Sequence, residues 1–347
     1  MRAALESFLI KSWSKRGIVA ILFWPLSKLF GFILHFRFGL RVLGYLPQTS
    51  LSVPVIVVGN IYVGGTGKTP MVIYLVEQLR LAGWTPGVIS RGYGAQLDHL
   101  IEVHADALAT EVGDEPLLIL QRTGCPMMVG QQRVASAQQL LARHPQVDVI
   151  ISDDGLQHYA LGRDVEILMF DQRGIGNGWL LPAGPLRESA QRRRDFTILN
   201  SVNKEFVSGI GEDVMQMRLA VDAVINLQNT ALRQPLSALR GEKILAAAGI
   251  GNPQRFFDML SGHELDFTPM PLADHFAFSP DLFKSIDAEI ILITEKDAVK
   301  CRQIAELRDD PRIWLVSVSA EIDAEFKEQL LKLLSLTSEK KHGCTST

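Results

Sequence analysis

The segment VGGTGKT, residues 63–69, constrains the fold of this chain more than any other part of the sequence. It follows Pro54–Val58, a short apolar and β-branched run that is typical of a buried strand, and it precedes a helical pattern that continues to Leu81. Glycines in such a loop let backbone N–H groups approach phosphate oxygens, and the start of a helix adds positive potential. The sequence therefore predicts a strand, a phosphate-binding loop and a helix in direct succession.

Two side chains of this loop have specific chemical roles. The Lys68 ammonium can reach the β and γ phosphates of ATP, and the Thr69 hydroxyl can ligate Mg²⁺. The strict pattern G-x-x-x-x-G-K-[ST] requires glycine at position 62, where this chain has Tyr62, and the variant with two adjacent glycines carries a lysine where this chain has Val63. A glycine-rich turn with an accidental GKT is the alternative, against which the strand–loop–helix context argues. The residues expected to bind the nucleotide are Tyr62, Val63, Gly64, Gly65, Thr66, Gly67, Lys68 and Thr69.

Strand and helix patterns alternate after Pro47, which predicts an α/β fold with a mostly parallel, P-loop NTPase-type sheet covered by helices. A second, smaller α/β domain is expected to begin after an alternating stretch near residues 215–228, which could form a linking pair of strands. The predicted organisation is a membrane-associated segment (1–49), a nucleotide-binding domain (50–225), a smaller α/β domain (226–337) and a flexible tail (338–347). Residues 173–194, rich in Gly, Pro and Arg, are expected to form a long functional loop.

The N-terminal segment differs in charge from the rest of the chain. Residues 1–49 hold seven basic residues against Glu6 alone, although the whole chain has a net charge of -3, which argues against a nucleic-acid partner. The apolar run 17–36 is interrupted by Pro25 and Lys28, so an interfacial helix at a membrane surface is favoured; a true span and a buried core helix are the alternatives. Three scattered cysteines indicate no disulfide framework and favour a reducing compartment.

Two acidic residues follow the second central strand pattern, Val147–Ser152. Ligands of an α/β sheet gather beyond the carboxyl ends of its strands, so Asp153 or Asp154 is expected to hold Mg²⁺ directly or through water, together with Thr69. A solvated turn at the strand end is the alternative. Gln157 and His158 follow closely enough to join the site and contact the substrate, although a purely structural role is as plausible.

Three further residues are candidates whose pattern alone leaves their role open. Arg91 follows a strand end and could face an anionic substrate group or solvent. Asp114 begins a helical pattern and could be a helix cap. His275 is a lone histidine in the second domain, where a structural role is the more common one.

Seven motifs in consistent order resemble the tetraacyldisaccharide 4'-kinase family of lipid A biosynthesis, over residues 12 to about 335. The motifs are VGNIYVGGTGKTP (58–70), SRGYG (90–94), VGDEP (112–116), SDDGLQH (152–158), LPAGPLRE (181–188), DHFAFS (274–279) and TEKDAVK (294–300). Each motif is modest alone, and the ordered set is specific.

The resemblance implies an ATP- and Mg²⁺-dependent kinase that phosphorylates an acylated disaccharide 1-phosphate at the cytoplasmic face of the bacterial inner membrane, without an obligate protein partner. It also implies that His275 is the general base toward the sugar 4'-hydroxyl, with Asp114 as its orienting partner and Lys68 as the third catalytic residue. A carboxylate beside a histidine strengthens the imidazole as a proton acceptor. Closure of the second domain would bring His275 to the loop.

Two other functions use the same features differently. A nucleotide switch of the SIMIBI type shares the double-glycine loop, but its signature lysine is absent at Val63 and no His- or Cys-rich metal tract is present. A non-enzymatic membrane adaptor could bind nucleotide only structurally. Hydrolysis that responds to a protein partner would favour the first, and vesicle binding without turnover the second.

Overall fold

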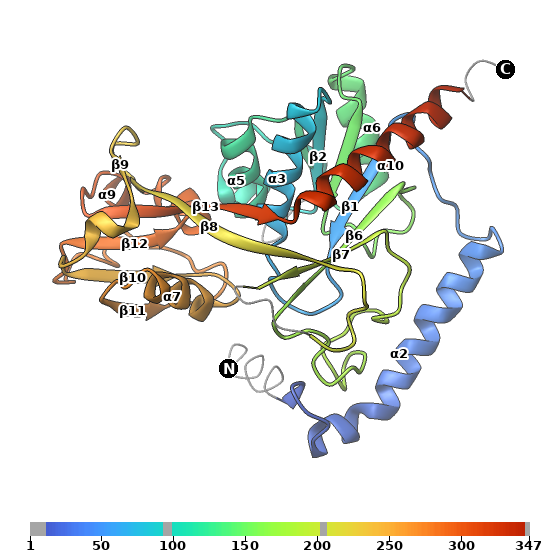
Figure 1. The fold of residues 1–347 in the computed structure, drawn as a ribbon, viewed down its shortest axis with the longest axis horizontal. Helices are drawn as coiled ribbons and strands as arrows, with labels where there is room; N and C mark the ends of the chain where they lie inside the picture. The colour runs from blue at the N-terminus through green and yellow to red at the C-terminus, as the bar shows by residue number, and fades with distance from the viewer. Residues whose placement is uncertain (1–11, 93–98, 202–206, 344–347) are drawn as a thin grey trace.

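The computed structural model describes residues 12–92, 99–201 and 207–343, and Figure 1 shows them as two lobes with a long helix along one side. The SRGYG motif therefore lies partly outside the described residues. The larger lobe contains β1 (Val55–Gly59), α3 (Lys68–Leu81), β2 (Pro86–Ser90), β3 (Ile101–Glu102), α4 (Ala109–Val112), α5 (Asp114–Thr123), β4 (Met127–Val129), α6 (Arg133–Arg143), β5 (Val149–Asp153), β6 (Val165–Asp171) and β7 (Phe196–Asn200).

The smaller lobe is connected to the larger one by two long strands, β8 (Val214–Asn226) and β13 (Ile313–Ile322). Its other elements are β9 (Arg233–Gln234), the 3-10 helix η1 (Leu236–Leu239), β10 (Ile244–Ala248), α7 (Pro253–Gly262), β11 (Phe267–Pro271), β12 (Ile290–Thr294), α8 (Glu295–Cys301) and α9 (Ala305–Arg308).

One 13-stranded sheet runs through both lobes of the described chain, in the order β11-β10-β12-β13-β8-β7-β6-β1-β5-β2-β4-β3, with β9 paired to β8. The strand pairs are parallel except β13–β8, β3–β4 and β8–β9. The strands β1, β2, β5 and β7 are buried at every residue, because layers cover both faces of the sheet. The predicted α/β class with a mostly parallel sheet is confirmed.

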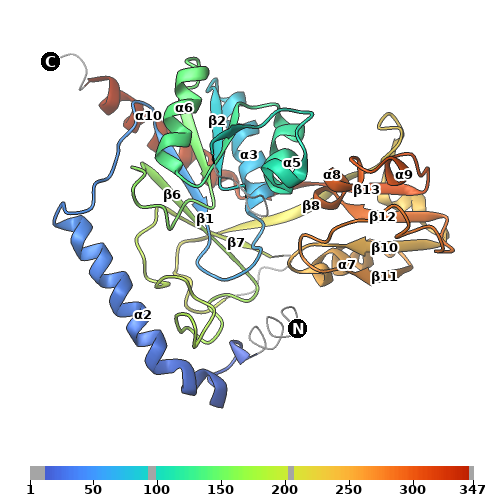
Figure 2. The same ribbon diagram turned by 180° about the vertical axis from the view of Figure 1, so that it is seen from behind.

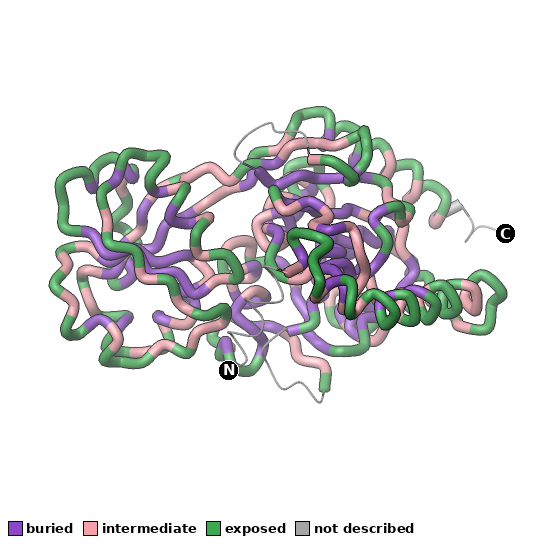
Figure 3. Tube along the Cα trace, turned by 90° about the horizontal axis from the view of Figure 1, so that it is seen from below, coloured by how far each residue is buried: buried purple, intermediate pink, exposed green. Residues whose placement is uncertain are grey.

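The two faces of the larger lobe have separate cores. On one face, α3 and α5 pack against the sheet together with the C-terminal helix α10 (Ala324–Gly343). On the other face, α6 and the segment between β5 and β7 cover it. Figure 2 shows α6 in front of the sheet when the molecule is seen from behind, and Figure 3 shows buried residues gathered in the interior of both lobes.

The connection between the lobes differs from the expected pair of strands near residues 215–228. A single strand, β8, pairs in parallel with β7 and, further along, antiparallel with β13. The reason is visible in the sequence, because the stretch 214–226 contains neither glycine nor proline to form a turn. The lobes therefore share a continuous ribbon of backbone hydrogen bonds.

The C-terminal helix also differs from expectation. A flexible tail was expected to begin at residue 338, but α10 continues to Gly343. Near its end, the Lys341 ammonium donates to the carbonyl oxygens of Leu51 (3.1 Å) and Val53 (2.9 Å) and pairs with the Asp164 carboxylate (2.8 Å). These contacts hold the last turns of α10 against the segment that precedes β1.

Helix α2 (Ile18–Val42) has unusually little protein around it. Only Ala20, Ser27 and Gly31 are buried along its length, and the Ser27 hydroxyl donates to the carbonyl of Leu180 at 2.8 Å. Its large apolar side chains are exposed, and the helix is long and apolar enough to cross a membrane by length and composition. The exposed set is Ile18, Ile21, Leu22, Trp24, Leu26, Leu29, Phe32, Ile33, Phe36, Phe38 and Val42.

Candidate active site

The phosphate loop lies between β1 and α3, and a buried asparagine holds its shape. The Asn60 amide donates to the carbonyl oxygens of Tyr62 (2.9 Å) and Gly64 (2.8 Å), and its Oδ1 accepts from the Lys68 ammonium at 3.3 Å. Asn60 is completely buried. One amide therefore fixes two loop carbonyls and the position of the lysine at once.

The end of the loop is fixed from the neighbouring strand. Gly67 has φ +90°, and a Cβ atom built there would lie 2.0 Å from Nδ2 of Asn200, the last residue of β7. That amide donates to the carbonyl of Thr66 at 3.0 Å, and Arg255 of α7 donates to its Oδ1. Glycine is required at position 67 both for its backbone conformation and for this close approach.

The start of α3 is suited to an anion. Its N-cap residue, Gly67, provides no side-chain cap, and the first turn contains no acidic residue. The free N–H groups and the helix dipole therefore remain available to a phosphate.

Tyr62 occupies the position where the strict motif has glycine, and the structure explains the difference. Tyr62 forms an isolated β-bridge with Leu186, and its ring is buried beneath the Arg173 guanidinium at 4.4 Å. Arg173 also donates to the carbonyl of Gly65 at 2.8 Å and is paired with Asp171. Position 62 thus continues the extended chain into a packed bridge, so it does not need the freedom of a glycine.

The acidic pair at the end of β5 faces the loop lysine. Asp154 lies 3.5 Å from the Lys68 ammonium and 3.6 Å from the Arg187 guanidinium. Burial would raise the pKa of Asp154, but Lys68 and Arg187 outweigh it and lower the value. The Asp153 carboxyl accepts from the Ser90 hydroxyl at 2.9 Å, and burial, aided by nearby Glu115, raises its pKa to about 6.

The described residues fit a magnesium ion that is held partly by phosphate and water. They contain no group of three or more His, Cys, Asp or Glu side chains that could enclose a metal. Within them, however, Asp153 Oδ1 and Thr66 Oγ1 are buried without a hydrogen-bond partner, and Thr69 stands in the first turn of α3. Mg²⁺ usually binds nucleotide sites through one or two protein oxygens, so this sparse set of ligands is appropriate.

A second group of side chains surrounds His275 in the smaller lobe. Its Nδ1 lies 3.0 Å from Oδ2 of Asp114, the first residue of α5, which is 4% exposed. The hydrogen bond to Asp114 raises the pKa of His275, against opposing effects of burial and Lys296. Burial would raise the pKa of Asp114, but His275 and Lys296 lower it. Gly113, with φ +93°, occupies the N-cap position, so the alternative that Asp114 merely caps α5 is wrong.

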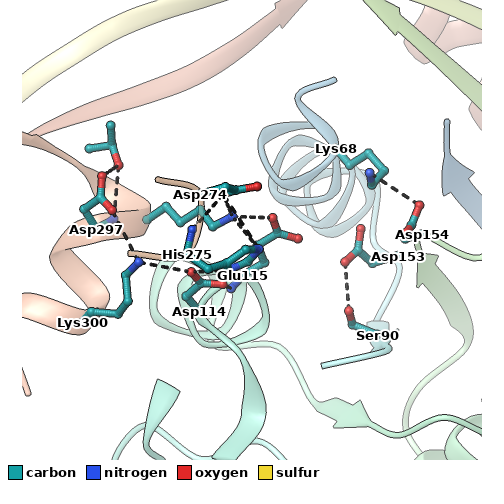
Figure 4. Close-up of polar contacts among 12 residues, drawn as sticks. Lys68, Ser90, Asp114, Glu115, Asp153, Asp154, Asp274, His275, Asp297 and Lys300 are labelled. Carbon is teal, nitrogen blue, oxygen red and sulfur yellow. Dashed lines mark hydrogen bonds and ion pairs between the residues drawn. The ribbon is translucent and has the colours of Figure 1, made fainter. Parts of the chain in front are cut away.

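Figure 4 shows these as two groups of contacts, one around Lys68 and one around His275. The lobes meet at the loop itself, because a Cβ atom built on Gly251 of the smaller lobe would lie 3.4 Å from the backbone nitrogen of Gly65. Glu115, beside Asp114, is close enough to raise the pKa of Asp153. Asp274, the residue before His275, lies beside Gly251, so His275 belongs to the segment of the smaller lobe that meets the phosphate-binding loop.

Comparison with known proteins identifies the family. The family model of LpxK, tetraacyldisaccharide-1-P 4'-kinase, matches residues 19–335. The tetraacyldisaccharide 4'-kinase of Herminiimonas arsenicoxydans is 54% identical over 96% of this chain and 97% of its own, and that of Azoarcus sp. is 47% identical over 93% and 94%. The chain belongs to the tetraacyldisaccharide 4'-kinase family. A crystal structure of LpxK from Aquifex aeolicus in complex with ATP is 26% identical to this chain, with a TM-score of 0.74. The match covers 91% of this chain and all of the Aquifex chain.

The remaining sequence candidates of this kinase-family chain lie around the same loop. The Gln157 amide donates to the carbonyl of Asn60 at 3.4 Å. Burial, with Arg133 and Arg91 nearby, lowers the pKa of His158 to about 4, so this histidine is neutral at physiological pH. Arg91 is exposed. The positive charge near His158 comes from Arg91 and Arg133. Contact of Arg91, Gln157 and His158 with a substrate stays a prediction.

Sequence reasoning did not single out three residues that shape this kinase-family site. Asn60 and Asn200 follow or end the strands β1 and β7, so the rule that ligands gather at the carboxyl ends of strands could have found them. Arg173 lies in the glycine-rich segment, where nothing in the sequence distinguished it from its neighbouring arginines.

Proposed function

We propose that this chain transfers the γ-phosphoryl group of ATP to the 4'-hydroxyl of a tetraacyldisaccharide 1-phosphate, as its relatives' names indicate for them. The observation that carries the proposal is the Asp114–His275 pair, 3.0 Å apart, in a protein whose smaller lobe meets the phosphate loop at Gly251 and Gly65. The ATP-bound state of the LpxK structure from Aquifex aeolicus supports ATP as the donor.

The loop's own residues bind the nucleotide. The backbone N–H groups of residues 63–69 and the start of α3 surround the phosphates, while the Lys68 ammonium stabilises negative charge on the group being transferred. Asn60 and Asn200 hold these donors in place before ATP arrives. Preorganised donors need no rearrangement during the reaction, and this is how most of the rate gain arises in phosphoryl transfer.

Thr69 and the carboxylates of Asp153 and Asp154 would hold Mg²⁺. When bound, the ion neutralises the phosphate charge and aligns the transferring group. The Asp153 carboxyl must be ionised to act as a ligand of Mg²⁺. A cation nearby would lower its raised pKa and so favour the carboxylate.

His275 accepts the proton of the attacking hydroxyl. Asp114 receives the Nδ1–H hydrogen bond, so Nε2 carries the lone pair that can take the proton, and the imidazolium that results is stabilised by the same carboxylate. The hydroxyl oxygen then attacks the γ-phosphorus in line with the departing ADP.

Helix α2 would keep the enzyme where an acylated substrate resides. Its apolar side chains are exposed, and the exposed Lys28 and Arg37 can approach anionic head groups if the helix lies in the membrane interface. We propose that the chain works at the cytoplasmic face of the inner membrane, since ATP and a reducing environment are found there. The domain limits at residues 49 and 225 remain part of this proposal, whereas α10 runs past the limit expected at residue 337.

The test is transfer of label from [γ-³²P]ATP to purified tetraacyldisaccharide 1-phosphate in detergent micelles. We expect a doubly phosphorylated lipid that depends on Mg²⁺ and on the acceptor. ATP hydrolysis that is indifferent to the acceptor, without labelled lipid, would contradict the proposal and favour a nucleotide switch.

A further inference from the structure

Lys296, in the first turn of α8, faces the side of His275 that is turned away from Asp114. Its ammonium lies 3.5 Å from Nε2 of His275, 2.9 Å from Oε1 of Glu115 and 3.4 Å from Oδ1 of Asp274. The side chain is only 14% exposed. An ammonium in this place contacts the nitrogen to which the proposed function assigns the proton transfer.

The backbone beneath Lys296 is firmly fixed. The Thr294 hydroxyl caps α8 by accepting from the N–H of Asp297 at 3.2 Å. The buried Asp297 carboxylate in turn accepts from the N–H of Gly249 (2.9 Å) and the Thr294 hydroxyl (2.7 Å). The TEKDAVK motif thus builds a rigid helix start that directs Lys296 toward α5 and His275.

The charge of Lys296 is also secured. Burial alone would lower its pKa, but the carboxylates of Glu115, Asp114 and Asp274 outweigh burial and raise it. The side chain is therefore an ammonium at every pH at which the enzyme works. An ammonium has only donors, so the Nε2 atom that it approaches must be an acceptor.

We propose that Lys296 is a positioning residue for the transfer reaction: it holds His275 in the tautomer with a lone pair on Nε2 and keeps that nitrogen unprotonated until the acceptor hydroxyl arrives. This inference rests on the proposed role of His275 as the base. Nδ1 has the Asp114 carboxylate as its partner at 3.0 Å, whereas the nearer of two charged neighbours of Nε2 is the Lys296 ammonium, at 3.5 Å against 3.8 Å for Oδ1 of Asp274.

The charged groups around His275 show why such a residue is needed. Asp114 of α5 and Asp274, the residue before His275, favour the imidazolium, whereas Lys296 of α8 opposes it. Two further charges lie one contact away, because Glu115 pairs with Lys296 and Lys300 pairs with Asp114. Without Lys296, the surrounding carboxylates would stabilise the imidazolium up to a higher pH. A protonated His275 could no longer accept the proton of the hydroxyl. Lys300, on the same helix, pairs with the Asp114 carboxylate at 3.6 Å, so it offers a matched comparison for Lys296.

The experiment measures His275 directly, by ¹⁵N NMR of the full-length protein with labelled histidine in detergent, without substrate. We expect the Nδ1–H tautomer in the wild type above the histidine titration. In Lys296→Met, the His275 titration moves to higher pH, while Lys296→Arg and Lys300→Met leave it closer to the wild type. The His275 signals are assigned with His275→Gln, and thermal melting verifies that each variant is folded.

The transfer assay adds a second readout. In Lys296→Met, kcat falls about tenfold more at pH 6 than at pH 8, since a histidine that is already protonated at acidic pH cannot act as the base. An Nε2–H tautomer in the wild type, or a titration that moves equally in Lys296→Met and Lys300→Met, would overturn the inference. The wild-type tautomer decides the question even where Lys296→Met does not fold. A protein with the expected tautomer but no transfer would instead contradict the proposed function.

Discussion

The phosphate loop and the histidine group are built in different ways, although they serve one reaction. The loop occupies consecutive residues and is fixed mainly by bonds to its own backbone, from Asn60 and Asn200. The histidine group brings together residues 161 positions apart, Asp114 and His275, and each is supplied by a different lobe. The phosphate-binding donors of the first site are neighbours in the sequence, although Asn200, which helps to fix them, lies 134 positions from Thr66. The second site exists only where the two lobes meet.

This difference indicates which changes each site tolerates. A loop held by backbone contacts is sensitive to one added methyl group, but its lysine can be removed without moving the loop. A site assembled from charged side chains is sensitive to each charge, because every member sets the protonation of the others. The predictions below separate these two kinds of dependence.

The largest expected effect is that of Lys68→Ala. Loss of the ammonium that faces the phosphates should lower transfer by on the order of 10³-fold. The His275 contacts should be undisturbed, because Figure 4 draws no hydrogen bond or ion pair between the two groups among the residues that it shows. Turnover is measured with labelled ATP, and association with lipid vesicles should not change. Lys284→Ala, an exposed lysine of the smaller lobe, is the matched control. Transfer within tenfold of the wild type would show that the loop does not act through Lys68.

The next largest effect is expected for Gly67→Ala. The added methyl group would meet the Asn200 amide at 2.0 Å, and the backbone has φ +90°, so we expect about 10–100-fold weaker ATP binding. Binding is measured by calorimetry. Gly83→Ala provides the control, since Gly83 has φ +89° but nothing within 4 Å of the added atom. Equal ATP affinity in both variants would mean that the packing against Asn200 is not important.

The smallest predicted effect concerns stability and pH. The raised pKa of Asp153, about 6, means that its contribution to stability is present at low pH and is lost as pH rises through 6. Asp153→Asn should therefore stabilise the metal-free and nucleotide-free protein at pH 8 by about 1–3 kcal/mol, with little change at pH 4.

Urea unfolding in EDTA tests this prediction, with Asp154→Asn as its counterpart. The pKa of Asp154 is lowered, so its ionised form stabilises the fold at neutral pH and that variant should lose stability there. Destabilisation by Asp153→Asn at pH 8 would contradict the account of this acidic pair.

The contrast between the two sites also explains what the sequence could predict. Helix α3 ends at Leu81 as expected, and β1 lies within one residue of its prediction, because apolar periodicity and glycine position act over short distances. The loop was recognisable for the same reason. A linking pair of strands was expected near residues 215–228, where β8 is one continuous strand. Its continuity becomes clear only from its pairing with β13, which lies far along the chain.

Long-range contacts account for the rest. Nothing near residue 341 indicates that Lys341 binds the carbonyls before β1, so α10 was expected to end earlier. The pairing of Asp114 with His275 came from family resemblance, not from spacing. The contact of Lys296 with His275 depends on the packing of α8 against α5, which no local pattern encodes.

The most direct test of the account is a paired measurement of ATP binding and single-turnover transfer in His275→Ala. If the loop binds ATP and the histidine acts only as the base, ATP affinity should stay within about twofold of the wild type. The transfer rate should fall about 10²- to 10⁴-fold, as expected for the loss of a general base. Full transfer in His275→Ala would contradict the account, because the histidine group would then have no part in the chemistry.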